Sequence, residues 1–301
     1  MSHLLRMPAR ILAVAGVTFT QLMRMRLFAV LALFALGFLA LQFIPYQENL
    51  GVEYQGIGQL QLLKDIAMGC MRVFCMLFCV AATALLIPKD SEDRILYTIL
   101  CKPVPRFDYL AGKALGVLAL LGCMLLLMDG MMVALLHLKE TAISADLQAA
   151  LTERGYKAED IAPYLQQVAE NGNTWNTQRS LLAIFLGFGV LTTLTLLISC
   201  VTSGTIVSMI MALGAYFIGM FQGQLFHTLA GHHGGISSLA QWAERALSVL
   251  LPDFSLFSVS DAASAGAELS PALLGGLGAI AAAYMLLHLL AATWIFSYKE
   301  F

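Results

Sequence analysis

Six apolar stretches, each about 20 residues long, recur along this chain of 301 residues. A helix of about 20 residues is needed to cross the roughly 30 Å hydrocarbon core of a bilayer, so each stretch is long enough to span a membrane. The stretches run from Leu27 to Ile44, Ile66 to Ile87, Ala114 to Leu138, Leu181 to Val201, Ile206 to Phe226 and Pro271 to Phe296. We therefore predict an all-α polytopic membrane protein with six transmembrane helices, forming one domain over residues 1–301.

The composition excludes two other classes of protein. Hydrophobic residues make up 59% of the chain and charged residues 12%, whereas a soluble domain is about 25% charged. An ordinary soluble enzyme is excluded, and so is a disordered chain, because so much apolar side chain must be buried. The 17 Lys and Arg residues include no long basic run, so we expect no nucleic-acid partner.

The basic residues also predict an orientation. With the N-terminus in the cytoplasm, ten basic residues fall in the inner segments and six in the longer outer segments. Basic residues concentrate in cytoplasmic loops, so we predict that both termini are cytoplasmic. The chain would then be a multi-pass protein of the cytoplasmic (inner) membrane.

The segments outside the apolar stretches have their own patterns. Residues 1–26 predict a helix with one apolar and one polar side, which would lie at the inner membrane interface. The outer loop 139–179 predicts two short helices, with Ser144 as the N-cap of the first and Gly155 as its end. The outer loop 227–270 predicts one further interfacial helix.

The inner loop 88–113 carries the most specific pattern. Its residues predict a short helix that Asp90 or Ser91 caps and that Pro103 ends. An apolar stripe on this helix would suit docking into a cytosolic partner, and it would equally suit packing against the chain's own spans. On periodicity alone the two interpretations are equally supported.

A family resemblance favours the docking interpretation. The loop reads as an acid followed by Arg-x-Leu-Tyr-Thr-x-Leu-x-Lys-Pro-Val-x-Arg over residues 93–106, and Gly112-Lys113 then opens the next span. This resembles the inner loop of ABC-2 type permeases, the membrane subunits of ATP-binding-cassette exporters. Two positions depart from the family pattern, because Ile95 stands where Thr is common and Cys101 where Ser is common.

The resemblance implies that the loop is a coupling helix that sits in a cleft of an ATPase. Carried over by position, the contacting or shaping residues would be Glu92, Asp93, Arg94, Tyr97, Lys102, Pro103 and Arg106. The chain has no Gly-x-x-x-x-Gly-Lys-Ser/Thr phosphate loop, so the ATPase would be a separate chain that binds ATP and Mg²⁺. This chain would carry no cofactor and no catalytic residue. The family also implies a homodimer, or a heterodimer with a second permease.

Two ionisable residues fall inside the predicted spans. Arg72 lies in the second and Asp129 in the third, at depths that differ by roughly one helical turn. Charge inside a membrane is costly, so each is a candidate functional residue, and an Arg72–Asp129 pair is feasible. The alternative is that Arg72 reaches outward while Asp129 is protonated.

Polar and sulfur-containing residues offer further candidates. Thr192, Thr195 and Ser199 share one face of the fourth span and would either line a substrate path or pack between helices. Cys75 and Cys79 also share a helix face, but we expect them to pack as small apolar residues. A cluster of His227, His232 and His233 suggests an alternative function as a membrane metalloenzyme, with Asp129 as a further candidate. The cluster lacks the His-Glu-x-x-His spacing, so we expect a flexible turn and no metal.

Overall fold

The computed structural model describes residues 2–40, 57–92, 105–202, 204–231, 251–259 and 268–298. Every regular element within these ranges is a helix, which confirms the all-α prediction. Five helical segments are long and apolar enough to cross a membrane, namely Gly58–Asp90, Arg106–Glu153, Ala158–Val201, Thr205–Gln222 and Pro271–Tyr298. They contain the second to sixth predicted stretches almost entirely. The first stretch begins in α2 (Arg26–Ala40), beyond which residues 41–56 are not described, so a sixth span stays a prediction.

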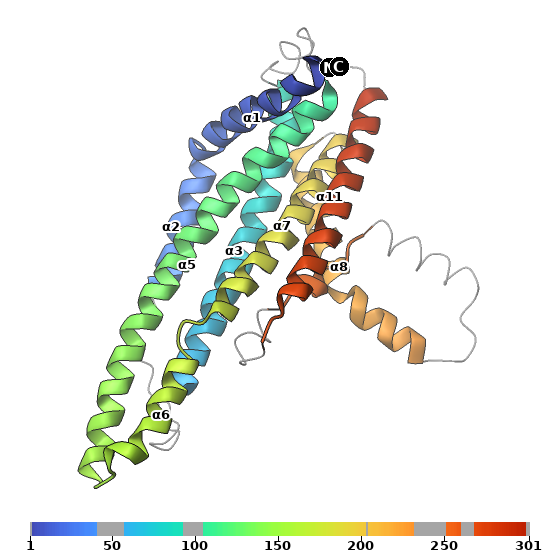
Figure 1. The fold of residues 1–301 in the computed structure, drawn as a ribbon. Coiled ribbons are helices and arrows are strands. Elements are labelled where there is room, and N and C mark those ends of the chain that lie inside the picture. Colours follow the sequence, from blue (N-terminus) through green and yellow to red (C-terminus); the bar gives the residue numbers. More distant parts are fainter. Residues whose placement is uncertain are drawn as a thin grey trace.

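Helices α3 (Ile57–Glu92) and α7 (Trp175–Val201) form the centre of the bundle (Figure 1). Helix α3 contacts α2, α5, α7 and α8, and α7 contacts α3, α5, α8 and α11. The share of residues buried in the most apolar part of each helix separates central from outer helices. It is 78% for α3 and 72% for the segment containing α7, but only 28% for α8 (Thr205–Gly231) and 17% for α11 (Pro271–Tyr298). The last two helices therefore lie at the periphery, where their apolar side chains suit contact with lipid.

Helix α1 (Ser2–Met23) packs along the first turns of α5 (Arg106–Glu153). Two glycines of α5 permit this close approach. A Cβ atom on Gly112 would lie 2.6 Å from Cβ of Val14, and one on Gly116 would lie 2.6 Å from Cβ of Thr18. Any larger residue at either position would push α1 away from the bundle.

Helix α5 is much longer than the predicted third span. It has 48 residues and continues without interruption past the predicted cap Ser144, so the two short helices expected in 139–179 are the end of α5 and a separate helix, α6 (Ala158–Glu170). The Ser144 hydroxyl donates to the Thr141 carbonyl within α5 instead of capping a new helix. Gly155 ends the helix as predicted, with a φ of +84° that only glycine adopts without strain.

Helix α3 also extends further than predicted. It continues through Pro88 to Glu92, so Asp90 lies inside α3 and does not cap a new helix. At the other side of the loop, α5 begins at Arg106. The loop is therefore shorter than the predicted coupling loop 88–113, because the two ends of that range belong to α3 and α5. Its middle, 93–104, lies outside the described residues.

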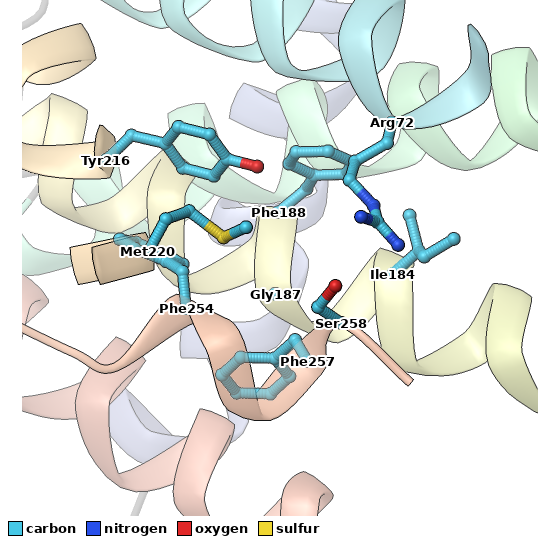
Figure 2. Close-up of a pocket in the computed structure, with 9 residues that line it drawn as sticks. All are labelled: Arg72, Ile184, Gly187, Phe188, Tyr216, Met220, Phe254, Phe257 and Ser258. Carbon is cyan, nitrogen blue, oxygen red and sulfur yellow. The ribbon is translucent and has the colours of Figure 1, made fainter. Parts of the chain in front are cut away.

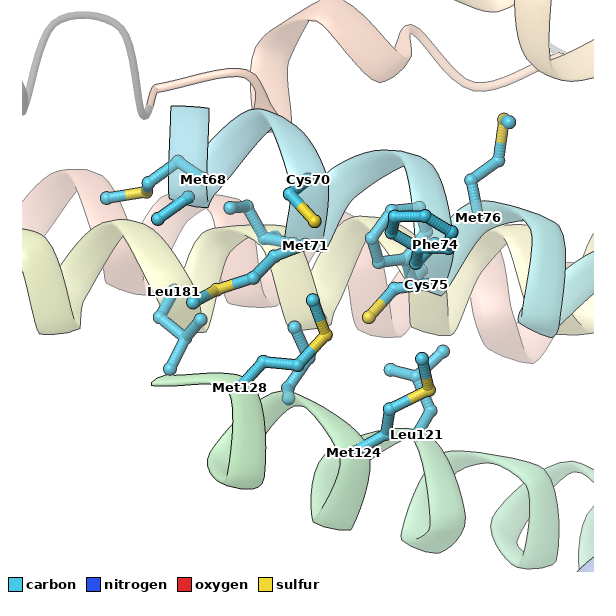
Figure 3. Close-up of a cluster of buried hydrophobic side chains, with 14 of the residues drawn as sticks. Met68, Cys70, Met71, Phe74, Cys75, Met76, Leu121, Met124, Met128 and Leu181 are labelled. Carbon is cyan, nitrogen blue, oxygen red and sulfur yellow. The ribbon is translucent and has the colours of Figure 1, made fainter. Parts of the chain in front are cut away.

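The core between α3, α5 and α7 is rich in sulfur. Met71 and Cys75 of α3 and Met124 and Met128 of α5 are buried and face one another (Figure 3). Methionine is unbranched and adaptable, so it fills the irregular space between helices without a partner for hydrogen bonding. The predicted packing role of Cys75 agrees with its position in this core.

Candidate functional site

A cluster of charged side chains lies where α3 ends and α5 begins. The ammonium of Lys113 lies 2.6 Å from Oδ2 of Asp90, and the Tyr109 hydroxyl donates to the same oxygen at 2.5 Å. The Asp90 side chain is 0% exposed and that of Lys113 is 4% exposed. A buried ion pair joins two groups that would each be costly to bury alone, so it fixes the end of α3 against the first turns of α5.

Helix α1 is joined to the start of α5 by side-chain contacts at the same end of the bundle. Nε of Arg10 in α1 donates to Oδ2 of Asp108 at 2.7 Å, and the Asp108 side chain is almost fully buried. Lys113 also donates to Oε1 of Gln21 at 3.4 Å, which adds a second contact between α1 and α5. These contacts, together with the close approach at the α5 glycines, hold α1 along the start of α5.

The last helix completes the cluster. The Arg106 guanidinium donates to the backbone carbonyl of Phe296 at 3.1 Å, near the C-terminal end of α11. A cation is favourable there, because the carbonyls of the last helical turn carry partial negative charge. The Phe296 ring also stacks on Tyr109, with a centroid distance of 6.1 Å.

We call these six residues the charged cluster: Arg10, Asp90, Arg106, Asp108, Tyr109 and Lys113. They come from α1, α3 and α5, and they contact α11. We call this end of the bundle, which also carries the ends of α1 and α11 nearest the termini, the charged end (Figure 1). The contacts of the charged cluster therefore link the end of α3 and the start of α5, on either side of the α3–α5 loop, to α1 and α11.

The predicted coupling residues are described only in part. Arg106 lies in the charged cluster, and Glu92 ends α3. Five others, Asp93, Arg94, Tyr97, Lys102 and Pro103, lie outside the described residues. For these five, and for the side chain of Glu92, the coupling role stays a prediction.

The pairing within the charged cluster is not among the predictions from the sequence. The sequence predicts Asp90 or Ser91 as a helix cap and places Lys113 only at the start of a span. A usable signal was present, since the acid Asp90 lies three residues after the second apolar stretch and the base Lys113 directly precedes the third. Two spans joined by a short loop are neighbours, so such charges are brought to the same membrane depth.

The two intramembrane charges have different neighbours in the structure. Asp129 accepts a hydrogen bond from the Gln178 amide at 3.1 Å, near the start of α7. The level of Arg72 can be compared with that of Asp129 through α7, which runs parallel to α3. Asp129 lies level with Gln178 of α7, whereas Met68 of α3 accepts a hydrogen bond from Ser180, two residues further along α7. Arg72 lies another four residues along α3, so the two charged residues are about six residues, or about 9 Å, apart along the helix axes. Their pairing stays a prediction.

The predicted hydroxyl path on α7 is packed between helices. Thr192 and Thr195 are buried, and each donates to a backbone carbonyl of its own helix at 2.8 Å. Thr192 also lies 3.1 Å from Sγ of Cys79, and Ser199 donates to the carbonyl of Ala84, both in α3. In this conformation the hydroxyls of Thr192 and Ser199 join α7 to α3, while that of Thr195 bonds within α7. The role of the three hydroxyls in a substrate path stays a prediction.

The histidine cluster falls largely outside the described residues. His227 belongs to α8, but its side chain is not described, and His232 and His233 follow the end of that helix. Within the described ranges, no group of three His, Cys, Asp or Glu side chains is arranged to hold a metal ion.

A pocket lies between α3, α7, α8 and the short 3-10 helix η2 (Phe254–Phe257). Figure 2 shows Arg72 directed into this pocket from α3. The pocket shares no residue with the charged cluster.

Comparison with known proteins adds no relative. No model of a known protein family matches the chain, and no curated protein matches it.

Proposed function

We propose that this chain is the membrane-spanning permease subunit of an ABC exporter. A separate ATPase chain would dock on the loop between α3 and α5, and its ATP hydrolysis would drive a substrate across the cytoplasmic membrane. The observation that carries the proposal is the loop motif over residues 92–113, which resembles that of ABC-2 type permeases. The all-helical, multi-span architecture is consistent with it.

The charged cluster gives the proposal a physical mechanism. A docked ATPase would push on the loop, and a loop with loosely held ends would absorb that push. Here the Asp90–Lys113 pair clamps the two ends together, and Asp108 and Arg106 connect them to α1 and α11. Movement of the loop would therefore be passed to the helices as a rigid displacement.

The remaining features of the proposal follow from this assignment. The chain would have six spans, with α2 as the first, and both termini in the cytoplasm together with the charged end. Two such subunits would form the transport pathway as a homodimer or heterodimer. ATP and Mg²⁺ would bind to the partner ATPase, and this chain would not itself be an enzyme.

The proposal is tested by purification of a tagged full-length chain from its native membranes in mild detergent. We expect an ATPase with a phosphate-binding loop to copurify and the preparation to hydrolyse ATP. Two charge reversals in the loop, Glu92→Lys and Arg94→Glu, should reduce the recovered ATPase by tenfold or more. Arg106 is left unchanged because its substitution would also release the end of α11.

The matched control is Arg154→Glu, a charge reversal on an exposed residue at the far end of α5. It should leave the copurified ATPase unchanged. A chain that is purified alone, and that crosslinks to no ATPase in its native membrane, would overturn the proposal.

A further inference from the structure

The pocket beside Arg72 combines one cation with apolar and aromatic walls. It is lined by Arg72, Phe188, Tyr216, Phe254, Phe257 and Ser258, among others, and encloses about 280 Å³ when the space at its open side is included. Figure 2 shows the guanidinium of Arg72 and the hydroxyl of Ser258 directed toward each other, while the Tyr216 hydroxyl points into the pocket from α8. Three polar groups are thus presented to one otherwise apolar space.

The wall formed by η2 is held in place by two close approaches. A Cβ atom on Gly187 of α7 would lie 2.9 Å from Cβ of Phe257, and one on Gly219 of α8 would lie 2.6 Å from the Pro252 carbonyl oxygen. Because both positions are glycine, η2 and the residue before it pack directly on the backbones of α7 and α8. This close packing fixes the wall of the pocket that η2 forms.

The N-cap of η2 strengthens this arrangement. Oδ1 of Asp253 accepts hydrogen bonds from the backbone N–H of Ser255 at 2.9 Å and from its hydroxyl at 2.6 Å. The cap fixes the turn that directs Phe254 and Phe257 into the bundle, where both rings are buried. Ser258 follows directly and is brought to the pocket by the same turn.

The chemistry of the lining selects for a particular kind of ligand. Inserting an arginine at the centre of a membrane span costs about 2.5–3.5 kcal/mol. Contact with an anion offsets part of this cost, so an arginine in a span is favoured where an anion can reach it. A guanidinium has five N–H donors, and it can bind a ligand oxygen in addition to a protein group. The hydroxyls of Tyr216 and Ser258 are further donors to an anion, and the aromatic walls suit the apolar carbon atoms next to its head group.

We propose that this pocket binds the head group of an anionic amphiphile, a phosphate or carboxylate on a single alkyl chain. The enclosed part of the pocket has room for about one water-sized atom, so one oxygen of the head group would enter it and the chain would not. The chain would leave through the open side of the pocket. This proposal extends the proposed function by naming a substrate class, and rests on it for that role, but the binding itself requires no ATPase.

The test is native mass spectrometry of the full-length chain in a neutral, short-chain detergent. Four probes are compared at equal concentration: dodecyl phosphate, dodecanol, dodecyltrimethylammonium and inorganic phosphate. We expect one dodecyl phosphate per chain, bound at least tenfold more tightly than dodecanol or the ammonium. Inorganic phosphate alone should bind at least tenfold more weakly, because it lacks the chain.

Substitutions locate the binding. Arg72→Gln should weaken dodecyl phosphate binding about tenfold or more, while Arg72→Lys should retain part of it. Tyr216→Phe and Ser258→Ala each remove one hydroxyl and keep the Arg72 charge, so each should weaken dodecyl phosphate binding by a few-fold. These two variants test the site independently if the Arg72 variants do not fold. The matched control Arg154→Gln removes an exposed arginine of α5 and should bind as the original chain does.

Three outcomes would overturn the proposal. The first is unchanged binding in a folded Arg72→Gln variant, or in both hydroxyl variants where Arg72→Gln does not fold. The second is equal binding of dodecanol, which would indicate only an apolar surface. The third is equal binding of inorganic phosphate, which would indicate an anion site without a chain. All three are measured without an ATPase, so they are distinct from failure of the exporter proposal.

Discussion

Replacement of Lys113 by methionine tests the physical basis of the charged cluster. Methionine keeps most of the length of the side chain, but it leaves the buried Asp90 carboxylate with Tyr109 as its remaining described donor. The second oxygen of Asp90, Oδ1, is also buried and has no hydrogen-bond partner among the described residues. Removal of one partner of a buried ion pair costs about 3–5 kcal/mol.

The loss is measured as a fall in melting temperature of the purified chain in detergent. One kcal/mol corresponds to about 2 °C for a chain of this size, so we expect Lys113→Met to melt about 6–10 °C lower. Unfolding of such proteins is often irreversible, so all variants are heated at one rate. The control Lys157→Met changes an exposed lysine near α6 and should shift the melting temperature by about 1 °C or less.

The double variant Asp90→Asn/Lys113→Met decides whether the loss comes from the pair. It removes both charges, and replacing a buried ion pair by neutral groups is often close to neutral in stability. We therefore expect the double variant to recover more than half of the loss seen in Lys113→Met. A double variant that melts no higher than Lys113→Met would refute the reasoning, because the cost would then not arise from an unpaired buried charge.

Three further predictions concern the packing of the bundle. Gly116→Val should lower the melting temperature, because overpacking against α1 costs about 1–3 kcal/mol, whereas Gly130→Ala, which meets no atom within 4 Å, should not lower it. Asp253→Ala should cost about 0.5–2 kcal/mol through loss of the η2 cap, and an unchanged melting temperature would contradict that role. Arg72→Gln and Asp129→Asn should each lower stability, and if the two residues pair as predicted, the double variant should depart from the sum of the two losses by more than about 0.5 kcal/mol; an additive loss would contradict the pairing.

The sequence predicted five of the six long apolar helices well, because crossing hydrocarbon requires a minimum length and an apolar composition. The start of α11 also carries a local signal, Ser270 followed by Pro271. Ser270 caps the helix, with its hydroxyl oxygen accepting a hydrogen bond from the Leu273 N–H at 3.2 Å. The preference of helix starts for Ser followed by Pro is local, so it can be read without knowledge of the fold.

The helix extensions were not predicted, because helices continue beyond the membrane without an apolar signal. Residues 139–153 of α5 are polar enough to resemble a loop, and Ser144 resembles a cap, yet no residue there stops the helix before Gly155. Asp90 was misassigned for a related reason. Its partners Tyr109 and Lys113 lie about 20 residues away, and only the packing of α3 against α5 shows that the carboxylate is used in a tertiary contact.

The length of α5 has a mechanical consequence. At 1.5 Å per residue its 48 residues extend about 72 Å, so one helix carries the charged cluster at one end and leads into the α6 hairpin at the other. If such a helix tilted as a rigid body by about 5° around its middle, each end would be displaced by about 3 Å, in opposite directions. A small rearrangement at the loop between α3 and α5 would thereby move the end of α5 and the start of α6, at the opposite end of the bundle, without any change within α5 itself.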